Sequence, residues 1–162
     1  MGAKHKLIPL EAGAHAPAFH LPRLEGGETS LAEIRAAGPA LLAFFKISCP
    51  VCQLAFPFFE RLHQPGRLPV YGISQNNARD TREFAKRYGV TFPILLDLES
   101  TGFPASNSYG LTNVPTAFLV ERDGAIAQTI LGWNKQQMSA LAATNGAALF
   151  HPGENVAEWK AG

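Results

Sequence analysis

Two cysteines separated by two residues, in the segment Cys49-Pro50-Val51-Cys52, constrain this chain more than any other feature. They are the only cysteines of the sequence, and they stand between an apolar run and a helical pattern. Residues 39–45 read as a buried strand, and residues 50–64 read as a helix that ends before Pro65. The pair is therefore expected at a strand-to-helix junction, with its first cysteine near the N-cap and the proline at the first helical position.

The helical spacing of the two cysteines suits reversible disulfide chemistry. Side chains three positions apart share one helix face, with β-carbons roughly 5–6 Å apart, and a disulfide requires roughly 3.5–4.5 Å. The free N–H groups of the first turn and the positive end of the helix stabilise a thiolate at Cys49. Cys52 lies one turn further in, next to Leu54 and Phe56, and is expected to be less exposed and less acidic. These differences predict that Cys49 attacks a substrate and Cys52 resolves the intermediate.

Composition excludes several classes of function. The 162 residues, 46% of them hydrophobic, predict one domain over residues 1–162. A formal net charge of +1 lacks the basic excess of nucleic-acid binders. No apolar stretch approaches the roughly 20 residues that span a bilayer, so membrane insertion is not expected. The apolar residues 7–10 are too few for a signal-peptide core, which favours the cytoplasm and leaves an exported mature form as the alternative.

Strand and helix patterns alternate along the rest of the chain. Beyond the cysteine helix, the expected helices are 31–37, 78–88 and 135–145, each after a capping residue, and the expected strands are 68–74, 93–97, 116–120 and 125–130. The last two strands flank Asp123-Gly124, a strong hairpin signal. The mixed segment 99–110 is expected to hold one short helix. This order predicts an α/β fold with a mixed central sheet covered by helices on both faces.

Further residues carry a family resemblance. They are Ala16-Pro17-Ala18-Phe19 in an extended leader, Pro57 inside the cysteine helix, Val114-Pro115-Thr116 before a strand and Gly132 after the next strand. With the cysteine pair, they make the chain resemble the thioredoxin fold, in the branch that holds thiol-disulfide oxidoreductases of the cytochrome-maturation type and the alkyl-hydroperoxide-reductase/thiol-specific-antioxidant proteins. The resemblance covers about residues 13–145 and leaves residues 147–162 as a C-terminal tail.

The resemblance implies a site and an activity. Pro115 would be in the cis form beside the active disulfide, and Val114 would offer its backbone to an extended substrate, as an exposed edge can. The implied activity is thiol-disulfide exchange, with a role in redox homeostasis or antioxidant defence. The Cys49–Cys52 disulfide would serve as the redox group without a further cofactor. The implied partners are a disulfide-containing protein or a small-molecule disulfide, together with an upstream thiol reductant.

Two other functions stay open. In a thiol peroxidase, Cys49 would become a sulfenic acid and Cys52 would resolve it. Peroxiredoxins carry a threonine three positions before the peroxidatic cysteine, where this chain has Lys46. Thioredoxin itself has a buried acid at the position of Ala43, so the proton acceptor for the second cysteine is unassigned.

A non-catalytic binding module is the other alternative, in which the same edge would hold a peptide or a metal. Zinc needs about four ligands. The chain offers two thiols, and His20, His63 and His151 lack a supporting spacing. No metal is therefore expected, and His63 is expected to be solvated near a helix end. Trp133 either borders the site or packs in the core.

Overall fold

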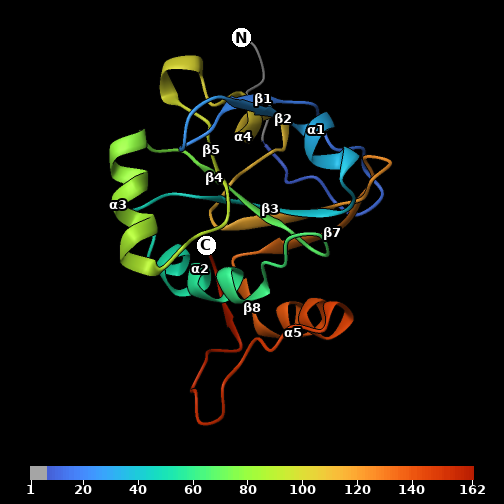
Figure 1. The fold of residues 1–162 in the computed structure, drawn as a ribbon, viewed down its shortest axis with the longest axis vertical. Coiled ribbons are helices and arrows are strands. Elements are labelled where there is room, and N and C mark those ends of the chain that lie inside the picture. Colours follow the sequence, from blue (N-terminus) through green and yellow to red (C-terminus); the bar gives the residue numbers. More distant parts are fainter. Residues whose placement is uncertain (1–6) are drawn as a thin grey trace.

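The computed structural model describes residues 7–162. The fold is built around a five-stranded mixed sheet (Figure 1). Its strand order is β5-β4-β3-β6-β7. The strands are β3 (Ala40–Phe45), β4 (Val70–Ser74), β5 (Ile94–Leu96), β6 (Thr116–Val120) and β7 (Ile126–Leu131). Strands β3, β4 and β5 are parallel, whereas β6 pairs antiparallel with both β3 and β7. Residues 1–6 of the predicted domain lie outside the described residues.

Helices cover both faces of the sheet, as predicted. They are α1 (Leu31–Ala36), α2 (Pro50–Leu62), α3 (Ala78–Tyr88), α4 (Pro104–Ser108) and α5 (Lys135–Asn145), with a 3₁₀ turn η1 (Glu99–Thr101) before α4. The predicted caps are present, because the side chains of Ser30, Asn77 and Asn134 each accept from the N–H three residues later. Helices α2, α3 and α5 pack on one face, and α1 and α4 pack on the other. None of the helices within residues 7–162 is long and apolar enough to cross a membrane.

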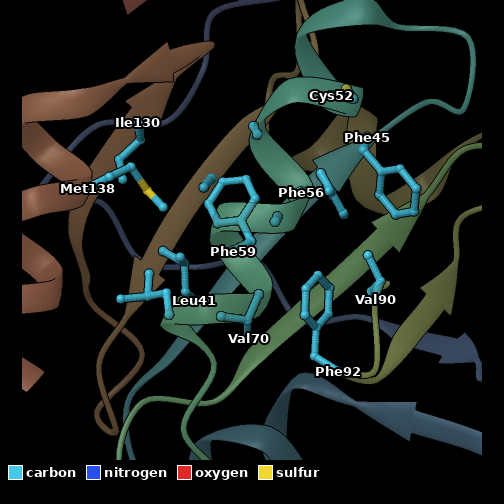
Figure 2. Packing of buried hydrophobic residues seen from close by; sticks show 14 of the residues in the cluster. Leu41, Phe45, Cys52, Phe56, Phe59, Val70, Val90, Phe92, Ile130 and Met138 are labelled. Carbon is cyan, nitrogen blue, oxygen red and sulfur yellow. The ribbon is translucent and has the colours of Figure 1, made fainter. Parts of the chain in front are cut away.

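The central strand β3 supplies both faces of the core. All six of its residues are buried. Leu41, Ala43 and Phe45 point toward α2 and α3, and the alternate residues join the cluster under α1 and α4. Figure 2 shows the first cluster, with Phe56 of α2 near Phe45 and Phe92 and with Cys52 at one end. The end of β3 that leads to the cysteine pair is therefore held from both sides.

The predicted leader is extended, and its end forms one strand of a hairpin that the sequence does not predict. Strand β1 (His20–Pro22) pairs antiparallel with β2 (Glu28–Ser30). Gly26 and Gly27 close this hairpin at φ values of 101° and 76°, in the region that glycine tolerates best. A strand of three residues is too short to show a clear alternation of apolar and polar residues, so the sequence pattern does not indicate this hairpin.

Helix α2 ends two residues earlier than predicted. His63 leaves the helix with an extended backbone, and its Nδ1 accepts from the N–H of Val70 at 2.9 Å. The side chain is half-buried, and burial lowers its pKa. The expectation that His63 is solvated is therefore wrong, because its ring fastens the end of α2 to the start of β4.

Candidate active site

The cysteine pair lies at the junction of β3 and α2, as predicted. Cys49 is the N-cap of α2, with extended φ and ψ angles of −85° and 115°, and Pro50 opens the helix. The Cys49 Sγ accepts a hydrogen bond from the backbone N–H of Cys52 at 3.2 Å. The sulfur thus satisfies one of the unpaired donors at the start of the helix, the role usually taken by an oxygen.

The two thiols occupy different environments, and both are free in this structure. Cys49 is half-buried, and Cys52 is fully buried in the cluster between α2 and the sheet. Burial raises the pKa of the Cys52 thiol, and the hydrogen bond with Cys49 adds to the rise. The sequence-based prediction that Cys52 is the less exposed cysteine is confirmed, and the raised pKa of its thiol fits the resolving role expected of it.

The loop before the first cysteine is held from two sides. The backbone N–H of Ile47 donates to Oδ1 of Asn76 at 3.0 Å, and Nε2 of Gln53 donates to the Ile47 carbonyl at 3.0 Å. Asn76 follows β4, and Gln53 lies in the first turn of α2. The position of Cys49 is therefore fixed by the segment that follows β4 and by the first turn of α2.

Val114 and Pro115 lie beside the first thiol. The peptide bond between them is cis, as the resemblance implies. The thiol of Cys49 donates to the carbonyl oxygen of Val114 at 3.3 Å. Pro115 is buried, and its carbonyl accepts from the N–H of Gly132 at 2.8 Å. All four residues predicted for the site therefore meet at one end of the sheet.

A hollow of about 350 Å³ opens beside Cys49. Its lining residues are Lys46, Cys49, Gln75, Leu111, Thr112, Asn113, Val114 and Gly162. Gln75 follows β4 as Lys46 follows β3, so these two residues leave parallel strands at the same edge of the sheet. Ligands commonly bind at this edge of α/β sheets, and that rule could have found Gln75 from the sequence.

A buried carboxylate supports one wall of this hollow. Asp97 is fully buried and accepts from the backbone N–H groups of Ala105 and Ser106, at 3.0 and 2.7 Å. The Ser106 hydroxyl donates to the same carboxylate at 2.6 Å and accepts from Nε2 of Gln75 at 2.7 Å. Gln75 is thus oriented by a polar chain that begins in the core.

Trp133 does not border the hollow. It is buried, and its ring stacks with Phe58 of α2 and with Phe150 of the tail, at centroid distances of 5.0 and 6.3 Å. Its indole N–H donates to the Ala157 carbonyl at 2.7 Å. Of the two interpretations of this residue, packing is the one that the structure supports.

Comparison with known proteins agrees with this architecture. Residues 12–129 match the model of the AhpC/TSA family. The thiol-disulfide oxidoreductase ResA of Geobacillus thermodenitrificans is 31% identical over 124 residues, which cover 74% of this chain and 69% of the relative. The ResA of Halalkalibacterium halodurans is 30% identical over 131 residues, covering 78% and 72% of the two chains.

A solved structure shows the same fold. The thioredoxin domain of a thiol-disulfide oxidoreductase from Bacteroides vulgatus aligns with a TM-score of 0.74 at 19% identity, covering 84% of this chain and 99% of that chain. The fold and the paired thiols define a protein of the thioredoxin-like class. Within that class, this chain belongs to the AhpC/TSA family.

Proposed function

We propose that this protein is a thiol-disulfide oxidoreductase whose redox group is the Cys49–Cys52 pair. The observation that best supports this function is the position of Cys49 Sγ, which lies between the N–H of Cys52 and the carbonyl of Val114 at the end of the sheet. One thiol is accessible and the other is buried one turn behind it, as a nucleophile and a resolving thiol require. The names of the ResA relatives support the same activity.

The reaction proceeds in two exchange steps. The Cys49 thiolate attacks one sulfur of a substrate disulfide, forms a mixed disulfide beside Val114 and Pro115, and releases the first substrate thiolate. Cys52, once deprotonated, attacks the Cys49 sulfur and releases the second. Two electrons pass from the cysteine pair to the substrate, and the two thiol protons end on the products. An upstream thiol reductant then restores the pair.

Thiol peroxidase activity is the second candidate, because the matched family model includes alkyl-hydroperoxide-reductase proteins. The position three residues before Cys49 holds Lys46 instead of the threonine of peroxiredoxins. Stabilisation of a peroxide by that hydroxyl is therefore missing, and disulfide exchange is the better supported activity.

We propose no metal or other cofactor and place the reaction in the cytoplasm. In support of the first point, a cysteine pair can by itself carry the two electrons of the exchange. A catalytic cysteine pair also suits a reducing compartment.

The proposal is tested by stopped-flow measurement of the loss of free thiol in the reduced protein. Hydrogen peroxide and a protein disulfide serve as oxidants in parallel experiments. We expect rapid reaction with the disulfide and a peroxide rate no greater than that of an ordinary thiolate. Cys49→Ser should abolish exchange, and Cys52→Ser should accumulate the mixed disulfide, visible by mass spectrometry. Full exchange activity in Cys49→Ser would refute the proposal, and a peroxide rate greater by orders of magnitude would establish the peroxidase instead.

A further inference from the structure

Residues 159–162, here called the strap, lie across the edge of the site. Strand β9 (Trp159–Lys160) pairs antiparallel with β8 (Trp133–Asn134), which follows directly after β7. Figure 1 shows the chain leaving α5, passing through a projecting loop and returning to end beside α2. The strap is therefore an added strand at the end of the molecule that carries the cysteine pair.

The preceding tail is fastened to the helix of the cysteine pair. Nη1 and Nη2 of Arg61 in α2 donate to the two carboxylate oxygens of Glu154, at 2.7 and 2.8 Å. Arg61 also donates to the carbonyl of Leu149 at 2.9 Å. Phe150 packs against Phe58 of α2 at a centroid distance of 5.4 Å. These contacts hold the tail that leads to the strap against α2, independently of the β8–β9 pairing.

Two glycines show how closely the strap approaches the site. A β-carbon added to Gly132 would overlap the carbonyl oxygen of Lys160. A β-carbon added to Gly162 would overlap the carbonyl oxygen of Val114. That same oxygen accepts from the Cys49 thiol. The strap therefore occupies the space next to Val114 that an extended peptide pairing with this edge would need.

The hollow beside Cys49 remains open on its other side. Lys46, Gln75 and the loop 111–114 line it, and Gly162 of the strap forms part of its wall. Its volume of about 350 Å³ falls at the small end of the range for small-molecule sites. A small disulfide can reach the thiol through this opening, whereas an extended chain cannot lie along Val114 while the strap is seated.

We propose that the strap is a specificity-determining segment that makes the protein prefer low-molecular-weight disulfides to disulfides in extended protein segments. This inference rests on the proposed exchange activity of Cys49. The small disulfide is cleaved by the Cys49 thiolate, one half leaves as a thiolate, and Cys52 releases the other half as it forms the intramolecular disulfide. A protein substrate meets a competing strand, so its exchange rate is the rate of the open form multiplied by the fraction of molecules in which the strap is away.

The test compares the two substrate classes with and without a seated strap. The probes are bis(2-hydroxyethyl) disulfide and the disulfides of insulin, and the readout is the second-order rate of thiol loss in the reduced protein. Deletion of residues 159–162 should raise the ratio of the insulin rate to the small-disulfide rate by about tenfold or more, because the edge becomes accessible in every molecule. Gly162→Leu, which keeps the chain length but displaces the strap from Val114, should raise the same ratio. Asn155→Ala, an exposed change in the tail loop, serves as the matched control.

An unchanged ratio in both strap variants would overturn the proposal. Loss of exchange with both probes already in the unaltered protein would instead refute the exchange activity. In that case, the effect of the strap is measured by the rates at which iodoacetamide and a maleimide attached to a large polymer alkylate Cys49. Removal of the strap should accelerate the reaction of Cys49 with the polymer-linked maleimide alone. Equal acceleration of both reactions, or of neither, would contradict the proposal that the strap restricts access to Cys49.

Discussion

The carbonyl oxygen of Val114 lies 3.3 Å from the Sγ of Cys49, although 65 positions separate the two residues in the chain. This contact joins the junction of β3 and α2 to the loop that begins β6. A small disulfide that binds in the hollow beside Val114 is thereby placed at the attacking sulfur. Positioning of this kind converts a bimolecular exchange into one with a high effective concentration.

The buried thiol should titrate late. Burial is the largest cause of the raised pKa of Cys52, and it persists when Cys49 is replaced. A raised pKa delays thiolate formation, so the iodoacetamide rate of Cys49→Ser should still climb at about pH 9.5, where an ordinary thiol with a pKa of about 8.5 levels off. The same variant unfolded in urea is the control. Identical plateaus in the folded and unfolded protein would contradict the prediction.

The tail should loosen in acid. Hydrogen bonds from Arg61 and from the His151 N–H lower the pKa of Glu154 from 4.5 to about 2. A lowered pKa means that the carboxylate stabilises the docked tail above about pH 4.5 and loses this contribution as the pH falls toward 2. Glu154→Gln should therefore accelerate hydrogen exchange of residues 147–158 already at pH 7. Glu158→Gln, which removes a more exposed pair with Lys135, should have a smaller effect.

The aromatic cluster should dominate stability. Phe56 is fully buried and packs against four rings, those of Phe45, Phe59, Phe84 and Phe92, in tilted or edge-on arrangements. Phe56→Ala is expected to lower the free energy of unfolding by about 3–5 kcal/mol in urea titrations. Leu131→Ala, at a side chain that is 53% exposed, should change it by no more than about 0.5 kcal/mol. Similar losses for the two variants would show that this cluster is not the centre of the core.

The carboxylate of Asp97 should matter for both folding and exchange. Its removal leaves the N–H groups of Ala105 and Ser106 buried without an acceptor, and one such group costs about 1–3 kcal/mol. Asp97→Ala should lower the free energy of unfolding by at least that amount and slow exchange, because Gln75 loses its oriented partner. Glu99→Ala, an exposed carboxylate nearby, is the control, and equal stability of the two variants would refute the prediction.

Much of the fold could be predicted because its signals are local. Ser30, Asn77 and Asn134 cap helices through side chains that act within three residues, and Asp123-Gly124 closes a hairpin of adjacent strands. The six apolar residues of β3 are buried on both faces, as a short continuous run predicts. Element ends were less predictable: α2 stops at Leu62 because the ring of His63 turns to the backbone of Val70, a tertiary contact.

Prediction of the site residues also depended on whether their signals were local. Cys49 and Cys52 act within one helical turn, so spacing alone places them. Val114 and Pro115 were reached only through a family resemblance, since no local rule links them to the cysteines. The position of the strap could not be predicted. The tail that leads to it is held by pairs such as Arg61 and Glu154, which are 93 positions apart in the chain. Such contacts leave no periodic pattern in either segment.

The sulfur of Cys49 is both the attacking atom and the N-cap of α2. An anionic acceptor makes a stronger hydrogen bond than a neutral one, so the start of the helix favours the thiolate over a sulfur already joined to Cys52. Interactions that stabilise the reduced pair raise its reduction potential. The capping of one helix therefore limits how strong a reductant this protein can be, and loss of the hydrogen bond from the N–H of Cys52 would lower the reduction potential of the pair.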